Sequence, residues 1–229
     1  ENVNEKKEEL LEKIKAYKIT DAVKSVTGTE IKSYSNENPE YRVVLFDFGY
    51  KRNIRNELVN RGCEVIVVPA DTTAEQIKEI SPDGIMFSNG PGDPAENTEI
   101  INNIREISKL GIPIFGICLG HQLMALAHGA KTEKLKYGHR GANQPVIDKV
   151  LSKTFVTSQN HGYAVVGDSI DPSEGTVSHI NANDGTCEGM RYSKENAFTV
   201  QFHPEAHGGP QDTAYLFDEF IDMMKKEMH

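Results

Sequence analysis

Apolar runs and helix-spaced apolar positions alternate along the chain from residue 41 onward. Four apolar runs of six to eight residues predict strands at residues 41–48, 64–69, 83–88 and 112–117. The segments that follow them predict four helices. Two lie around residues 52–60 and over residues 119–128, one begins at a Thr72-Thr73-Ala74-Glu75 capping box, and one carries Ile100, Ile104 and Ile107 on one face. Strands that alternate with helices in this way build a parallel sheet with helices on both faces.

The pattern is different near both ends of the chain. Shorter apolar runs without intervening helices predict an antiparallel or mixed extension, at residues 155–157, 164–166, 177–180, 188–192 and 198–202. A last amphipathic helix carries Phe217, Phe220, Ile221, Met224 and Met228. Residues 5–18 alternate Glu and Lys around a thin apolar stripe, which predicts a short helix, and the polar residues 33–39 predict a linker.

We therefore predict an α/β fold with a mostly parallel central sheet, helices on both faces and a small mixed or antiparallel extension. Residues 1–40 are expected to form a helical arm and connector, and residues 41–229 one domain. The alternative for the first segment is a frayed terminus.

The composition limits which classes of protein this sequence can belong to. The 229 residues include 25 Lys and Arg against 34 Asp and Glu, a formal charge of -9, which argues against nucleic acid or an anionic membrane surface as a partner. No run approaches the roughly 18 apolar residues of a membrane helix, and the charged first residues do not resemble a secretory signal. The three cysteines lie far apart without CxxC spacing, so we expect a reducing, cytoplasmic setting in which a functional cysteine is a nucleophile.

Cys118 is the best candidate for that nucleophile. It lies in a G-x-C-x-G frame from Gly116 to Gly120, where a predicted strand meets a predicted helix. Such a strand–turn–helix elbow exposes the nucleophile of many hydrolases, and a helix N-terminus favours a thiolate. The alternative is a small cysteine packed between sheet and helix, which is what we expect of Cys63 and Cys187.

A thiol nucleophile needs a base and a group that orients the base. His203 follows a predicted strand and precedes Pro204 and Glu205, so the carboxylate two residues later can hold the imidazole. His207 is four residues after His203, but Pro204 prevents the helix that would bring both to one metal ion, and no metal site is expected. Residues 89–94 (NGPGDP) form a rigid turn that suits an oxyanion hole, with a purely structural turn as the alternative.

Six segments together resemble the class I, triad-type glutamine amidotransferases, and more closely the glutaminase domain of carbamoyl-phosphate synthase small subunits. They are DFGYKRNI at residues 47–54, SNGPGDP at 88–94, FGICLGHQLMAL at 115–126, YGHRGANQPV at 137–146, SQNHGYAV at 158–165 and QFHPEAHGGPQDT at 201–213. They occur in the family's order and cover nearly all of residues 41–229. The segments at 137–146 and 158–165 resemble the carbamoyl-phosphate group specifically.

The resemblance implies a catalytic triad with Cys118 as nucleophile, His203 as base and Glu205 as the orienting carboxylate. Attack on the side-chain amide of glutamine would release ammonia and leave a glutamyl thioester, which water hydrolyses to glutamate. The resemblance also implies an oxyanion hole formed by Gly92 and the backbone N–H of Leu119. The other implied substrate-binding residues are Gly90, which lines the pocket, and Gln122, Asn160, Gly162 and Tyr163, which hold the amino and carboxylate ends of glutamine. The role of His161 stays open.

By the same resemblance, the ammonia would pass through a tunnel to a large synthase subunit that uses ATP and Mg²⁺, so no cofactor is expected in this chain. The family's small subunit has a domain before the glutaminase, so residues 1–40 are expected to be a remnant of that domain. The resemblance also implies that a serine of the missing part contributes to the glutamine pocket. Three alternatives stay open. They are a glutaminase for GMP or anthranilate synthesis, a non-catalytic partner-binding subunit, and a γ-glutamyl or peptide hydrolase with the same triad.

Overall fold

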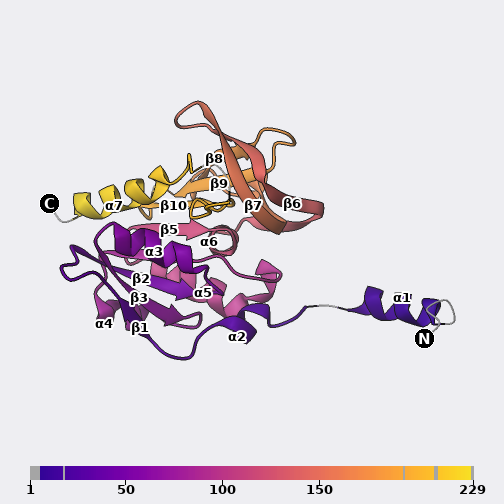
Figure 1. Ribbon diagram of the computed structural model, residues 1–229, viewed down its shortest axis with the longest axis horizontal. Helices are drawn as coiled ribbons and strands as arrows, with labels where there is room; N and C mark the ends of the chain where they lie inside the picture. The colour runs from indigo at the N-terminus through magenta and orange to yellow at the C-terminus, as the bar shows by residue number, and fades with distance from the viewer. Residues whose placement is uncertain (1–5, 18, 193, 209–210, 228–229) are drawn as a thin grey trace.

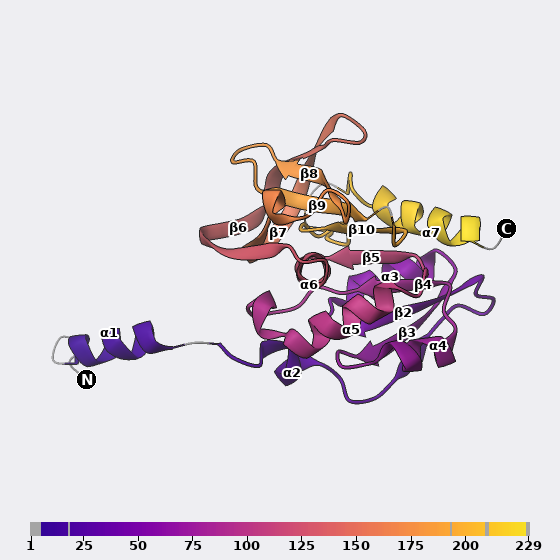
Figure 2. The ribbon, with the colours of Figure 1, turned by 180° about the vertical axis from the view of Figure 1, so that it is seen from behind.

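The structure, a computed structural model, describes residues 6–17, 19–192, 194–208 and 211–227. Within them, ten strands form one sheet in the order β1-β3-β2-β4-β5-β10-β9-β7-β6-β8 (Figures 1 and 2). Glu5, Lys18 and Met228, which the sequence pattern assigned to helices, lie outside the described residues, as do two residues of the last motif, Gly209 and Pro210.

Five neighbouring strands form the parallel part of the sheet. They are β3 (Cys63–Pro69), β2 (Tyr41–Asp47), β4 (Gly84–Phe87), β5 (Ile114–Ile117) and β10 (Ala197–Val200). The helices between them confirm the predicted alternation. They are α3 (Arg52–Asn60), α4 (Ala74–Ile80), the 3₁₀ turn η1 (Pro94–Glu96), α5 (Thr98–Ser108) and α6 (Leu119–Ala127).

The remaining strands pair antiparallel, so the predicted mostly parallel sheet is not confirmed and the sheet is mixed. They are β1 (Lys32–Tyr34) at one edge and β6 (Lys131–Asp148), β7 (Lys153–Val166), β8 (Thr176–Asn181) and β9 (Cys187–Tyr192) at the other, with the 3₁₀ turn η2 (Gly167–Ser169) after β7. The two runs predicted at residues 155–157 and 164–166 are parts of the single strand β7. The extension is larger than predicted because it includes β6, which no pattern in the sequence predicted. The charged residues, glycines and proline of β6 lack alternation, and its pairing with β7 is interrupted by register shifts.

Helices cover both faces of the sheet, as predicted. On one face α4, α5 and α6 pack residues such as Ile77, Ile104 and Leu123 into one apolar core. On the other face α3 and the C-terminal helix α7 (Tyr215–Glu227) pack Leu58, Phe217 and their neighbours into a second core. Because both faces are covered, the loops at the strand ends are the part of the sheet left open for chemistry.

The first 40 residues are divided between an exposed helix and a segment that joins the sheet. Helix α1 (Lys7–Ala16) has no buried residue and lies apart from the sheet (Figure 1). By contrast, α2 (Ala22–Val26) buries Val23, and β1 pairs with β3 at the sheet edge. The boundary predicted at residue 40 therefore does not coincide with the edge of the sheet, and residues 33 and 34 of the predicted linker are strand residues.

The predicted capping box is wrong by one position. Thr73, not Thr72, is the N-cap of α4, and its box partner is Gln76 rather than Glu75. Thr72 is buried and its hydroxyl donates to the Pro69 carbonyl in the turn after β3, so it is not available as a cap. Among the described helices, none is long and apolar enough to cross a membrane.

Candidate active site

The ends of two neighbouring parallel strands bring Cys118 and His203 to the same edge of the sheet. Cys118 directly follows β5, and His203 lies three residues after β10, the strand paired with β5. The backbone N–H of Cys118 donates to the Val200 carbonyl at 2.8 Å, which fixes the turn after β5 against the end of β10. The backbone N–H of His203 donates to the Ser158 carbonyl of β7 at 2.9 Å, which ties the extension to the same place.

Cys118 adopts the conformation of a nucleophile elbow. Its φ of 53° and ψ of -100° place a non-glycine residue in a strained region, directly before the first residue of α6. The turn needs a glycine at position 120, since a Cβ there would lie 2.3 Å from the Phe87 carbonyl oxygen. The strand and helix can approach this closely only without a side chain, which explains the G-x-C-x-G frame.

His203 and Glu205 form a buried pair beside this turn. His203 Nδ1 lies 2.9 Å from Glu205 Oε1, and the two residues are 5% and 1% exposed. Burial alone would lower the pKa of His203, but the neighbouring Cys118 sulfur and then the Glu205 carboxylate outweigh burial and raise that pKa to about 9. The arrangement therefore favours an imidazolium next to the sulfur, which is the charge state that activates a cysteine nucleophile.

Lys51, which was not among the predicted site residues, completes the charge arrangement. Lys51 Nζ lies 3.6 Å from Glu205 Oε1, and the Asn53 side chain donates to the Glu205 carbonyl at 3.3 Å. Burial acts to raise the pKa of Glu205, but His203 and Lys51 lower it overall, so the carboxylate stays ionised. Lys51 lies in the DFGYKRNI segment, so its position after the first strand of the parallel sheet was the signal that could have identified it.

The predicted oxyanion residues lie where the β4 turn meets α6. A Cβ on Gly90 would be 2.6 Å from Leu119 Cδ2, which places that turn against the first residue of α6. Across the described part of the chain, the Leu119 and Gly92 N–H groups make no hydrogen bond to a protein acceptor. An oxyanion hole requires unpaired donors near the nucleophile. Leu119 directly follows Cys118, and Gly92 lies two residues after Gly90 in the turn that meets Leu119.

Gln122 and Tyr163 are brought together, and Asn160 and Gly162 lie on the same strand as Tyr163. Gln122 Nε2 donates to the Tyr163 carbonyl at 2.7 Å and to Gln201 Oε1 at 2.9 Å. Gln201 was not predicted, although it lies inside the last motif two residues before His203. Asn160 is exposed, Gly162 and Tyr163 are half-buried, and all three belong to β7.

Tyr163 also connects β7 with the predicted oxyanion turn. Burial, followed by the carboxylate of Asp93, raises the pKa of the Tyr163 hydroxyl. The structure thus brings together the predicted nucleophile, base, orienting carboxylate and turn, with β7 beside them.

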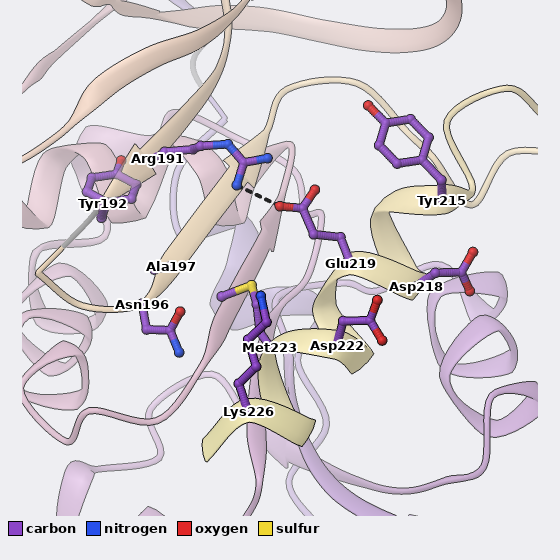
Figure 3. Close-up of a pocket in the computed structure, with 10 residues that line it drawn as sticks. All are labelled: Arg191, Tyr192, Asn196, Ala197, Tyr215, Asp218, Glu219, Asp222, Met223 and Lys226. Carbon is purple, nitrogen blue, oxygen red and sulfur yellow. Dashed lines mark ion pairs between the residues drawn. The ribbon is translucent and has the colours of Figure 1, made fainter. Parts of the chain in front are cut away.

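A separate hollow of about 600 Å³ lies between β9 and α7 (Figure 3). Arg191 and Glu219 form an ion pair of 2.6 Å across it, and Asp218, Asp222 and Lys226 lie on the helix side. None of the predicted site residues lines this hollow, so it is not the candidate active site.

Comparison with known proteins gives the family. The model of the glutamine amidotransferase class-I family matches residues 44–223. The chain belongs to this family. The match includes every residue of the predicted site, from Gly90 to Glu205.

Similar proteins refine this assignment. The chain is 50% identical over 225 residues to a carbamoyl phosphate synthase small chain of Bacillus cereus, covering 98% of this chain and 60% of that protein. It is 53% identical over 220 residues to that of Staphylococcus epidermidis (95% and 59% covered) and 55% identical over 187 residues to that of Fusobacterium nucleatum (82% and 52% covered). The chain thus spans about 60% of the length of the first of these relatives.

Solved structures of low sequence identity share the fold. A Thermoplasma acidophilum protein described as a GMP synthase subunit has a TM-score of 0.72 at 22% identity, with 82% of this chain and 96% of that chain covered. A glutamine amidotransferase of Thermotoga maritima has a TM-score of 0.58 at 18% identity, with 82% and 85% covered. At these identities the likeness establishes the class I glutamine amidotransferase fold.

Proposed function

We propose that this chain hydrolyses the side-chain amide of glutamine through a thioester on Cys118. The observation that carries the proposal is the strained turn at Cys118, with the buried His203–Glu205 pair beside it and two unpaired N–H groups at Gly92 and Leu119. A non-catalytic relative has no need to keep a strained nucleophile and a buried, ionised carboxylate together.

The residues divide the reaction into two steps. The Cys118 thiolate attacks the amide carbon, the oxyanion is held by the N–H groups of Gly92 and Leu119, and the His203 imidazolium gives its proton to the departing ammonia. Neutral His203 then takes a proton from water, the hydroxide attacks the thioester carbon, and the C–S bond breaks to release glutamate and the thiolate. Glu205 stays ionised and orients the imidazole in both steps.

The residues around the turn supply the substrate site in this proposal. Gly90 lines it, and Gln122, Asn160, Gly162 and Tyr163 hold the amino and carboxylate groups of glutamine. Support comes from the bond between Gln122 and the Tyr163 carbonyl, which joins α6 to the strand that carries the other three residues.

We further propose that the ammonia serves carbamoyl phosphate synthesis in a large partner subunit. Three relatives at 50–55% identity are named carbamoyl phosphate synthase small chain, and a small chain requires a large one. ATP and Mg²⁺ would then act in the large subunit, with no cofactor in this chain, and residues 1–40 would be the connector to a preceding domain. The acceptor is identified by measuring glutamate release in the presence of a purified large synthase subunit, a GMP synthetase or an anthranilate synthase. The partner that stimulates glutamate release is the acceptor.

The hydrolysis itself is tested by intact-mass analysis after exposure to a diazoketone analogue of glutamine. We expect one adduct, suppressed by excess glutamine, absent in Cys118→Ala and retained in the matched control Cys63→Ala, whose thiol is buried in the core with its pKa raised by burial to about 12. An adduct that persists in Cys118→Ala, or a folded wild type that takes no adduct, contradicts the proposal. A panel of γ-glutamyl peptides offered as substrates tests the peptide-hydrolase alternative.

A further inference from the structure

A partly buried charged cluster lies beside the proposed glutamine site, on the part of β6 that pairs least regularly. His139 of β6 lies opposite His161 of β7, and register shifts interrupt the ladder on both sides of residues 139–141. Only three residue pairs hold this short piece of backbone between the shifts. Side chains must therefore fix its position.

Two carboxylates clamp the His139 ring. Nδ1 lies 3.1 Å from Glu188 Oε1 of β9, and Nε2 lies 2.9 Å from Asp184 Oδ2 in the turn before β9. Glu188 has no exposed surface, and its Oε1 also accepts from the Asn181 side chain at 3.2 Å. The bond to Glu188 is the main reason that the pKa of His139 is raised to about 9, so the ring is an imidazolium at neutral pH.

His161 links His139 to the proposed substrate-binding residues. The His161 ring packs edge-on against the His139 ring, with centroids 5.0 Å apart. Burial, followed by the charge on His139, lowers the pKa of His161 to about 4 and keeps it neutral. His161 Nδ1 lies 2.8 Å from the Tyr163 carbonyl, the same oxygen that accepts from Gln122.

The atoms of this cluster that could bind a metal ion already face partners within the protein. One atom each of His139, His161 and Glu188 lies within 4.8 Å of the others, close enough for a shared cation. Both ring nitrogens of His139, however, face carboxylates, and those of His161 face the Tyr163 carbonyl and Gln159 Oε1. Burial raises the pKa of the Glu188 carboxyl, which the hydrogen bonds with His139 and Asn181 only partly offset, so the proton of this pair lies between Glu188 and His139 Nδ1. With that proton in place, Nδ1 has no free lone pair for a metal ion.

We propose that His139 is a positioning residue for glutamine: clamped between Glu188 and Asp184, it holds residues 160–163 in the geometry that binds the two charged ends of the substrate. The proposal rests on the proposed function. Within the residues that the structure describes, neither His139 nor Glu188 shares a hydrogen bond or ion pair with Cys118, His203 or Glu205. The clamp therefore acts on glutamine affinity and leaves the reactivity of the thiol unchanged.

The pH dependence follows from the groups that face His139. They are Glu188 on β9, Asp184 in the turn and His161 on β7. Arg140, the next residue of β6, acts on His161. Because the pKa of His139 is raised, the clamp is intact below the ordinary histidine pKa of 6.5 and is lost as the pH rises through about 9. Glutamine binding should weaken over that upper range, and in Glu188→Gln it should weaken at lower pH.

The test compares wild type, Glu188→Gln and His139→Gln in the 229-residue chain. We measure KM and kcat for glutamine, the rate of Cys118 alkylation by iodoacetamide, and the glutamine concentration that halves this rate. Both variants should raise KM and the protecting concentration about tenfold, with kcat and unprotected alkylation within about twofold of wild type. The matched control is Glu195→Gln, the same change in the His128–Glu195 pair of 3.5 Å, which should alter none of them.

A second measurement keeps the test independent of variant folding. The His139 ring is followed by NMR in the wild type, where it should titrate near the raised value of about 9. Titration near the ordinary value, or unchanged KM and protection in a folded Glu188→Gln, overturns the positioning role. Equal losses of kcat and unprotected alkylation overturn it too, because the clamp would then act on the triad. A wild type that iodoacetamide alkylates but glutamine never protects contradicts the proposed function itself.

Discussion

In the proposed reaction, a single histidine determines whether Cys118 is activated. His203 is almost fully buried, which opposes a charge on its ring, and it is nevertheless favoured as an imidazolium because the Cys118 sulfur and Glu205 flank it. The general acid and base role proposed for it is worth roughly 10²–10⁴-fold in rate. His203→Ala should therefore lower glutamine turnover by at least about a hundredfold in a kcat measurement.

The control for this prediction is another histidine of the same segment. His207 has a half-exposed side chain and bonds to Gln211 at 2.8 Å, away from the pair. His207→Ala should leave kcat within about twofold, since surface changes rarely reach a buried site. A loss below tenfold for His203→Ala would exclude it as the base.

The His203–Glu205 pair also determines how the stability of the fold should depend on pH. Because the pKa of His203 is raised from 6.5 to about 9, its pairing stabilises the fold fully below 6.5, and this stabilisation is lost as the pH rises through about 9. Glu205→Gln removes part of the cause, so its free energy of unfolding should fall less between pH 7 and pH 9.5 than that of wild type. Urea denaturation at the two pH values measures both slopes, and parallel slopes would contradict the assignment.

Residues within one short motif were predictable from their spacing, whereas contacts between residues far apart in the chain were not. Cys118 between its glycines and His203 two residues before Glu205 carry their spacing in the sequence. Lys51 lies 154 positions before Glu205, and Gln201 meets Gln122 across 79 positions, so their contacts depend on the order of strands in the sheet. No local pattern encodes that order.

At the scale of elements, the turn between β5 and α6 has the least freedom. A Cβ at position 120 would approach the Phe87 carbonyl oxygen to 2.3 Å, and backbone atoms of β4 cannot move aside without disturbing the sheet. Gly120→Ala should lower the free energy of unfolding by about 1–3 kcal/mol in urea denaturation. Gly208→Ala is the control, because no atom of the described residues lies within 4 Å of a Cβ there. An equal effect of both changes would contradict this explanation.

The N-cap of α4 tests how finely an element boundary can be predicted from sequence. Thr73→Ala should cost about 1 kcal/mol of unfolding free energy and Thr73→Ser almost none, since the serine hydroxyl also accepts from the Gln76 N–H. Two adjacent threonines satisfied the same spacing rule, and only the burial of Thr72 in the preceding turn distinguishes them. Similarly, β6 was missed because its register is set by its neighbours and not by alternation of its own residues.

At the scale of the whole molecule, part of the segment before residue 41 packs against the domain that carries the proposed active site. The Gly28 N–H donates to Asp47 Oδ2 at 2.9 Å, and the Ala70 N–H donates to Thr27 Oγ1 at 3.0 Å. A Cβ on Gly92 would meet the Ala22 side chain at 2.6 Å, so α2 rests directly on the proposed oxyanion turn. Helix α1 shares none of this burial.

Two truncations separate these contributions. Removal of residues 1–17 should leave the free energy of unfolding unchanged, because every described residue of that segment is exposed. Removal of residues 1–34 should lower it by at least about 2 kcal/mol, the value of burying one Val23 side chain, since the edge strand β1 is lost as well. It should also slow diazoketone labelling of Cys118, because the turn that carries Gly92 loses the helix it rests on. Full labelling after the longer truncation would mean that β4 and α6 alone hold the oxyanion turn in place.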